Sequence, residues 1–353
     1  MSEEATVDLL SVLRDAESQE RHGAHEAAEA GFRRAAESAD PAVKAAALRG
    51  VASYLVLRGS NQEGLETLRR IVETGDPQET ARALRNIGTL LEDHFGDPAG
   101  ARAAYEQAIA CDHPLHSQGA RVNLAQLLER EGDLDGAARL LVETIDSGHP
   151  VESNRARVLL GFLLEGAGDN AGALQCFEEA MREPDSEWGQ RGAFQAGAIY
   201  LAKLGDPGRA CDAFSVAARL PEPNFAVTAM FLLGEAERER NNEDGAIEAY
   251  GRAVSLEGVS TPNGRSALFA AAKQAGSLCL QRHDLDSARA YLTRAASADD
   301  GEERARAACL LGLCEREAGN YVAAREAFGD SLSNPGAPPE IVEIAQNALR
   351  ELG

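Results

Sequence analysis

The sequence is poor in aromatic residues, which make up 5% of its 353 residues and include one Trp. Large aromatic side chains dominate the interior of compact domains, and a single core stops growing at about 250–300 residues. One deep core is therefore not expected for this chain. The choice lies between several domains and an open array of repeated units. Abundant Ala and regularly scattered Gly favour the array, because each unit of an array buries only a shallow layer of side chains.

Long apolar runs and paired cysteines are also missing. No segment approaches the ~18 consecutive apolar residues of a membrane span. The chain opens on an acidic segment, Met1-Ser-Glu-Glu, where a secretory signal would be basic, and no apolar run follows. The six cysteines form no C-x-x-C pair, which predicts free and mostly buried thiols in a reducing compartment. We therefore expect a cytoplasmic protein that has no membrane partner.

Positive charge is scarce, since only three lysines accompany the arginines and the formal net charge is −22. An acidic surface keeps an elongated protein in solution and repels the phosphates of nucleic acid and anionic lipid. Nucleic acid is therefore not an expected partner. A basic partner is a weaker alternative, because acidic surfaces mostly only solvate a protein.

Catalytic and metal-binding signatures are not found. The sequence has no G-x-S-x-G, no Walker phosphate loop and no H-E-x-x-H. Cys111, His113 and His116 place three soft ligands near one joint, but Pro114 bends the segment and no fourth ligand is evident. We expect no metal, no cofactor and no enzymatic activity.

A short phrase recurs along the whole chain. It begins Gly-Asp in its clearest copies, as at Gly96-Asp97 and Gly132-Asp133. The nine copies start at Gly23, Gly59, Gly96, Gly132, Gly168, Gly205, Asn241, His283 and Gly319. Successive starts lie 36 or 37 residues apart, except for one step of 42 residues that places an insertion near residues 258–264. Nine copies on so narrow a period indicate a solenoid of repeated supersecondary units.

Each phrase predicts the end of one helix and the start of the next. The Gly ends a helix in the left-handed conformation that other residues enter only at a cost. The Asp, Ser or Asn that follows can accept hydrogen bonds from the free N–H groups of the next helix. Asn241 is a plausible substitute for Gly, but His283 is a poor one, so the turn at His283 should differ.

The apolar positions around each phrase follow a helical period, and we expect them to form the core. Small residues recur five positions after the start of the phrase: Ala28, Gly64, Ala101, Ala137, Ala173, Ala210, Ala246, Ala288 and Ala324. Large residues follow four positions later: Phe32, Leu68, Tyr105, Leu141, Phe177, Phe214, Tyr250, Leu292 and Phe328. Small residues also precede the phrase: Ala52, Gly88, Ala125, Gly161, Ala198, Gly234, Gly276 and Gly312.

This pattern, seen in Leu160-Gly161, Gly168-Asp169, Ala173, Phe177 and Ala180, resembles the tetratricopeptide repeat. Joints such as Ser147-Gly148-His149-Pro150 are similar to those of the related Sel1-like repeats. The resemblance covers nearly the whole chain and implies an all-α, right-handed α–α superhelix of about nine antiparallel helix pairs with a concave face. The repeats would span residues 1–336. A capping helix would span residues 337–353, with an apolar stripe of Ile341, Ile344, Ala345, Ala348 and Leu349.

In proteins that resemble this one, the first helix of each pair lines the concave surface and holds an extended peptide or a partner's helix. Asn86 and Asn123 occupy the same slot in consecutive repeats, next to Arg85, and Arg155 projects from the following repeat. The set is similar to the clamp by which some tetratricopeptide proteins hold an acidic C-terminus. It departs from the clamp at two places, since Leu159 stands in the Asn slot of the third repeat, where a cation is expected, and Arg replaces Lys at position 85. The alternative is a set of ordinary polar groove residues. The border of the stretch would be Arg82, Gln126 and Arg130.

A second group, Phe162, Ile199 and Phe231 with Lys203 and Lys273, is expected on the same side. Apolar groove residues beside cations suit an acidic, amphipathic partner helix. The alternative is that neighbouring helices cover them.

The sequence therefore predicts a non-catalytic scaffold or adaptor that binds a peptide or partner protein in its concave groove. The alternative is a regulatory receptor in which a peptide closes the superhelix and changes the grip on another protein. The identity of the partner and association into a homo-oligomer stay open.

Overall fold

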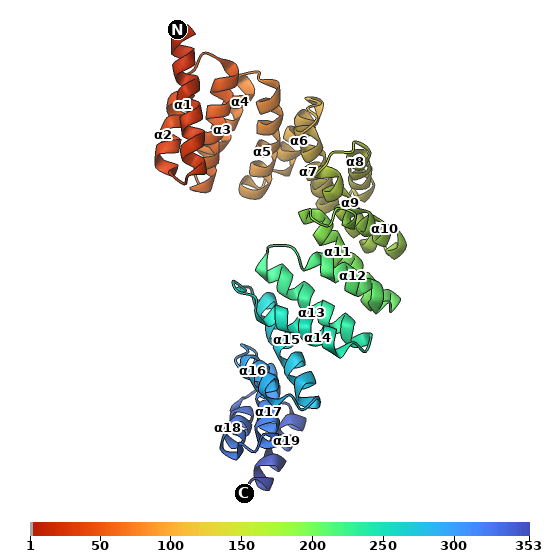
Figure 1. The fold of residues 1–353 in the computed structure, drawn as a ribbon. Helices are drawn as coiled ribbons and strands as arrows, with labels where there is room; N and C mark the ends of the chain where they lie inside the picture. The colour runs from red at the N-terminus through yellow and green to blue at the C-terminus, as the bar shows by residue number, and fades with distance from the viewer. Residues whose placement is uncertain (1–2) are drawn as a thin grey trace. The chain divides into compact units, whose positions relative to one another are not determined.

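The computed structural model describes residues 3–353, and every regular element in this range is a helix (Figure 1). The first helices of the successive pairs are α1 (Glu3–Arg21), α3 (Pro41–Leu57), α5 (Pro77–Phe95), α7 (His116–Glu131), α9 (Glu152–Gly166), α11 (Glu187–Ile199), α13 (Pro223–Glu239), α15 (Pro262–Gln281) and α17 (Gly301–Glu317). The second helices are α2 (His25–Ala35), α4 (Asn61–Glu73), α6 (Pro98–Ala110), α8 (Leu134–Asp146), α10 (Asn170–Met181), α12 (Pro207–Ala217), α14 (Glu243–Val254), α16 (Leu285–Ala295) and α18 (Tyr321–Ser333). A π-helical segment, η1 (Tyr200–Leu204), continues α11, and α19 (Pro339–Glu351) is the last helix.

The helices form two compact units, residues 1–167 and 168–353. Within each unit every helix packs on the one that follows it, and some first helices of neighbouring pairs also touch, as α5 touches α7 and α13 touches α15. The expected all-α class and its repeated helix pairs are confirmed.

The turns between paired helices have one backbone conformation at all nine starts of the repeated phrase. The seven Gly starts have positive φ, and so do Asn241 and His283, each at 59°. The expectation that the turn at His283 differs is wrong. Its closing hydrogen bond, from Asp284 N to Cys279 O at 2.9 Å, matches the bond from Asp133 N to Leu128 O in a Gly turn. A left-handed residue other than Gly costs roughly 1–2 kcal/mol, which the packing of the two flanking helices offsets here.

The residue after each turn start caps the second helix in most pairs. Side-chain oxygens accept from backbone N–H groups at Asp97, Asp133, Asp169, Asp206, Asn242 and Asp284. Ser60 and Asn320 make no such bond, so the expected cap is wrong at these two positions. The Asn320 amide instead donates to Glu315 Oε2 at 2.7 Å.

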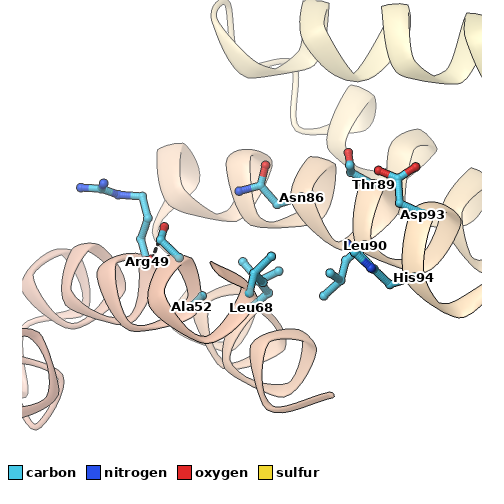
Figure 2. Close-up of a pocket in the computed structure, with 10 residues that line it drawn as sticks. Arg49, Ala52, Leu68, Asn86, Thr89, Leu90, Asp93 and His94 are labelled. Atoms are coloured by element: carbon cyan, nitrogen blue, oxygen red, sulfur yellow. Dashed lines mark hydrogen bonds between the residues drawn. The ribbon is translucent and has the colours of Figure 1, made fainter. Parts of the chain in front are cut away.

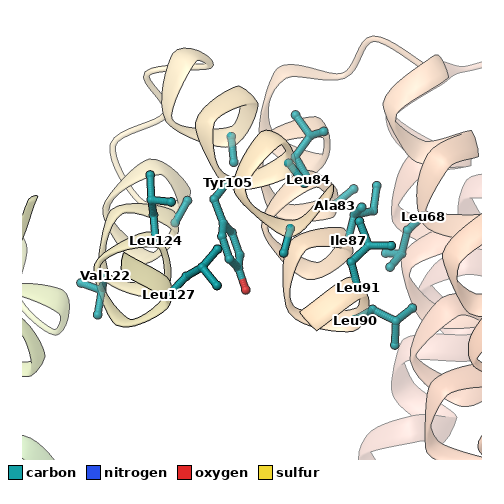
Figure 3. Close-up of a cluster of buried hydrophobic side chains, with 14 of the residues drawn as sticks. Leu68, Ala83, Leu84, Ile87, Leu90, Leu91, Tyr105, Val122, Leu124 and Leu127 are labelled. Atoms are coloured by element: carbon teal, nitrogen blue, oxygen red, sulfur yellow. The ribbon is translucent and has the colours of Figure 1, made fainter. Parts of the chain in front are cut away.

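The core follows the small and large positions of the repeat. All nine large residues are at most 4% exposed. A Cβ atom at Gly88 would lie 2.4 Å from the Tyr105 ring, so glycine is what lets that ring lie on α5. The ring inserts between α5 and α7, beside Leu124 and Leu127 (Figure 3).

The small residue that the sequence predicts opposite Phe214, Ala198, is wrong. The small residue that faces Phe214 is Gly197, whose added Cβ would lie 2.8 Å from the ring, and Ala198 is only half-buried. The π-helical segment Tyr200–Leu204 adds one residue before Gly205 and shifts the register by one.

The last helix, α19, packs against Phe328 through Ala345 and Ala348, with Ile341 and Leu349 half-buried beside them. Ile344 is 42% exposed, so the expected apolar stripe does not include it. The insertion near residues 258–264 is held to α13, since Asn224 Oδ1 accepts from the backbone N–H groups of Ser260 at 2.8 Å and Thr261 at 3.0 Å.

Candidate functional site

The first helices of the N-terminal unit, α3, α5, α7 and α9, lie side by side in that order. On α5, Arg82, Asn86, Thr89 and Asp93 follow at spacings of four, three and four residues, and Arg85 lies four residues before Thr89. Such spacings place side chains on one face of a helix. The sequence thus builds a polar stripe on α5 that has cations near its start and a carboxylate near its end.

Asn123, Gln126 and Arg155 are brought together between α7 and α9. Arg155 Nη2 donates to Asn123 Oδ1 at 3.0 Å and to Gln126 Oε1 at 2.7 Å. Arg155 Nη1 also lies 3.5 Å from a carboxylate oxygen of Glu152. The Asn123 amide reaches Thr89 Oγ1 at 3.4 Å. Of the predicted clamp residues, Asn123 and Arg155 therefore pair across α7 and α9, and Gln126 joins them from the predicted border.

Arg82 contacts a buried histidine that the sequence analysis considered only as a metal ligand. Arg82 Nε donates to His116 Nε2 at 3.2 Å, and the His116 ring, 5% exposed, stacks on His113 with 4.9 Å between ring centroids. Burial, and then the charges of Arg82 and Arg85, lower the pKa of His116 to about 4. The His113 Nδ1 atom accepts from the backbone N–H of Leu115 at 3.3 Å. The ring nitrogen atoms of His113 and His116 thus form hydrogen bonds at the start of α7.

Arg130 pairs with Glu92 across α7 and α5, and its Nε donates to Gln126 O at 3.2 Å. The Tyr105 hydroxyl donates to the same Glu92 carboxylate at 3.1 Å. Glu92 is thus held on two sides, and the neighbouring Asp93 is exposed.

A cavity of about 230 Å³ lies between α3, α4 and α5, and Figure 2 shows the residues that surround it. It is lined by Arg49, Ala52, Ser53, Val56, Leu68, Asn86, Thr89, Leu90, Asp93 and His94. Of the predicted site residues it holds Asn86 alone. The sequence analysis missed Arg49 and Asp93, although Arg49 occupies the same slot as Arg85 one repeat earlier.

The second predicted group is not a single surface. Ile199 is 3% exposed, so its expected place in the groove is wrong. The register shift by which Gly197, and not Ala198, faces Phe214 also places Ile199 at a core position, two residues after Gly197. Phe231 is half-buried, with its ring 6.0 Å from that of Tyr250.

The remaining members of that group have partners or lie apart. Lys273 pairs with Glu303, and Lys203 Nζ donates to Asn170 Oδ1 at 2.6 Å. Phe162, 39% exposed, belongs to the other unit.

Stacked helix pairs define the α-solenoid class of proteins. A family model identifies the repeat family within that class. The tetratricopeptide repeat model matches residues 52–114, 122–187, 196–261 and 274–338, well over half of the chain. The chain belongs to the tetratricopeptide repeat family.

Three solved structures illustrate the likeness in fold. A Sel1 repeat protein from Oxalobacter formigenes is 17% identical, with 96% of this chain and 90% of that chain covered and a TM-score of 0.46. The C-terminal part of a TPR repeat-containing protein from Cytophaga hutchinsonii is 12% identical, with coverages of 84% and 98% and a TM-score of 0.47. YrrB, described as a TPR protein with an unusual peptide-binding site, is 20% identical, with coverages of 60% and 99% and a TM-score of 0.44. No curated protein matches this sequence.

Proteins of this family generally serve as non-catalytic scaffolds, and the repeats make this chain a scaffold for protein–protein interaction. Across residues 3–353, none of the helices combines the length and the apolar character needed to cross a bilayer.

Proposed function

We propose that the face formed by the first helices of the N-terminal unit binds a peptide or a segment of a partner protein. The observation that carries this proposal is the cavity between α3 and α5, which has an apolar floor and is bordered by the polar stripe of α5. Peptide sites of this kind combine apolar pockets for side chains with polar groups for the main chain.

Asn86 supplies a carboxamide at the cavity. The neighbouring Thr89 hydroxyl is already used, since it donates to Arg85 O at 3.3 Å and lies 3.4 Å from the Asn123 amide. A carboxamide offers both donors and an acceptor. It therefore matches the N–H and C=O of a peptide backbone, which would otherwise lose their water on binding without replacement.

Arg155, with Asn123 and Gln126, supplies a second point of attachment in this proposal. Its side chain is 23% exposed, and its guanidinium donates to two uncharged side-chain oxygens. An incoming carboxylate would add an ion pair, because it brings a negative charge that these amide oxygens lack, and the planar guanidinium can bind it in a bidentate manner. Capture of an acidic C-terminus is thus compatible with the pairing of these residues.

The net charge of −22 supports a polypeptide partner rather than nucleic acid. The six free cysteines, of which four are buried and only Cys111 is exposed, support a location in the reducing cytoplasm. The alternative function, a receptor that closes around a peptide, would give a ligand-dependent decrease in the radius of gyration by solution scattering. A rigid scaffold would give no such change.

Site-specific photo-cross-linking in the native host tests the proposed binding face. A photoreactive amino acid replaces Thr89, which is exposed on α5, or Glu106, which is exposed on α6 in the same pair. We expect a discrete polypeptide adduct from position 89 and none from position 106. Equal adducts at both positions, or an adduct at position 106 alone, would rule out binding on this face.

A further inference from the structure

The cavity between α3 and α5 has an aliphatic floor of a size that suits one side chain. Ala52 and Val56 come from α3, Leu68 from α4 and Leu90 from α5. Its volume of about 230 Å³ lies below the roughly 300–1,000 Å³ of small-molecule sites. An aliphatic side chain from another polypeptide fits this floor better than a free metabolite does.

A cation lines one end of the cavity. Arg49 Nε lies 3.3 Å from Glu79 Oε2 and its Nη2 lies 3.8 Å from Glu17 Oε1. Both contacts are ion pairs, and Arg49 Nε is buried. The Arg49 side chain is 32% exposed, so the donors left for an incoming carboxylate are those of the terminal nitrogens Nη1 and Nη2, which can bind it in a bidentate manner beside Glu17 and Glu79.

A carboxylate lines the other end. Asp93 is exposed and, within the part of the chain that the structure describes, forms no hydrogen bond or ion pair. Its neighbour Glu92 is held by Arg130 and Tyr105. Asp93 is therefore the carboxylate left for a cation of a ligand. Figure 2 shows Arg49 and Asp93 at opposite ends of the site, with Asn86 and Thr89 between them.

The spacing of the two charges can be estimated from the helix geometry. Arg49 lies three residues before Ala52, and Asp93 lies five residues after Gly88, which holds the same slot on the neighbouring helix. Eight residues at a rise of 1.5 Å separate the charges by roughly 12 Å along the helices. In an extended chain, residues i and i+4 lie about 13 Å apart and point to the same side as residue i+2. In a helical ligand, residues i and i+4 lie only about 6 Å apart along the axis.

We propose that this cavity binds an extended peptide segment of the form acidic–x–aliphatic–x–basic. The acidic side chain meets Arg49, the aliphatic side chain fills the floor formed with Leu68 and Leu90, and the basic side chain meets Asp93. Asn86 binds the main chain between them. This inference rests on the proposed function and narrows it to a ligand of stated sequence character and conformation.

A short fluorescent peptide tests the inference by anisotropy with the full chain. The probe is Gly-Glu-Thr-Leu-Thr-Arg-Gly-amide with a neutral fluorophore coupled to its N-terminus through an amide bond, so that neither end carries a charge. We expect Asp93→Lys to weaken its binding about tenfold, as loss of a charge-assisted contact predicts. The same variant should regain that affinity for a peptide in which Glu replaces Arg. Glu106→Lys makes the same change in net charge away from the cavity and should alter the affinity less than twofold.

Three results would overturn the inference, and the first two compare the variants. One is an affinity that Asp93→Lys and Glu106→Lys change equally, and the other is failure of the Glu-for-Arg peptide to regain affinity for Asp93→Lys. Absence of any binding by the probe also overturns it. The proposed function survives each of these results if cross-linking at position 89 still yields a partner, so the two failures can be told apart. Circular dichroism of both variants checks that the fold is intact.

Discussion

At the residue scale, each helix pair depends on a small residue that lets a large one approach. Gly312 on α17 faces Phe328 on α18, and an added Cβ would lie 2.6 Å from the ring. Gly329, also on α18, has open space around the position of an added Cβ. The same substitution should therefore have opposite effects at two positions of one helix pair.

We expect Gly312→Ala to lower the free energy of unfolding by about 1–3 kcal/mol, the usual cost of overpacking a core. Gly329→Ala should raise it by roughly 0.5–1 kcal/mol, because Ala is the better helix former and meets no neighbour. Urea unfolding followed by circular dichroism measures both. A stabilised Gly312→Ala variant would show that the Phe328 ring moves aside at no cost.

At the element scale, the structure shows two ways to start a first helix. Asp76 caps α5 through a bond from Glu79 N to its Oδ1 at 2.8 Å. At α9 the cap is a histidine, since His149 Nδ1 accepts from the N–H of Glu152 at 3.0 Å. His113 does the same for α7, and the buried His116 ring stacks on it. A protonated imidazole has no acceptor, so these joints depend on neutral histidines.

The start of α7 predicts a pH dependence. Burial, and then the charges of Arg82 and Arg85, lower the pKa of His116 to about 4, from 6.5 in an unfolded chain. Between these values the unfolded chain binds the proton more readily, so the stability present above pH 6.5 is lost as the pH falls toward 4.

Replacing the titrating ring should reduce this loss. His116→Gln keeps an acceptor for Arg82 but does not titrate, and we expect its stability to fall less between pH 6.5 and 4. His22→Gln, at an exposed position, is the control. Denaturant midpoints measured across the pH range compare the three proteins. Parallel curves for wild type and His116→Gln would assign the acid sensitivity to other groups.

At the scale of the whole molecule, charge and repeat number define what the chain can bind. A net charge of −22 spread over a chain of repeats opposes contact with another polyanion. Its arginines are largely used in pairs such as Arg102 with Glu131 and Arg306 with Glu302. We therefore expect no retardation of duplex DNA or single-stranded RNA in gel shifts between about 50 and 200 mM salt. Binding that weakens linearly on a log–log salt plot would contradict this prediction, because that dependence reports phosphate contacts.

Much of the fold could be predicted because local chemistry specifies it. A left-handed helix end followed by a capping side chain needs only a few adjacent residues, so the turns at Gly96 or Gly168 follow from the sequence. The positions of Tyr105 and Phe214 in the core follow from helical periodicity. The candidate site was harder to predict. Arg49, Leu68 and Asp93 come from three helices and line the same cavity only because neighbouring helix pairs stack. No spacing along the chain therefore links them.

The amino-acid sequence alone determined the all-α class, the period of the pairs and most residues of the core, because helix formation and helix ending act over a few residues. Only the tertiary structure decided which residues face a cavity and which turn inward. One extra residue in the π-helical segment Tyr200–Leu204 moved Ile199 from the expected groove into the core. Side-chain pairing across helices likewise decided that Arg155 bonds Asn123, since such contacts depend on how neighbouring helices pack.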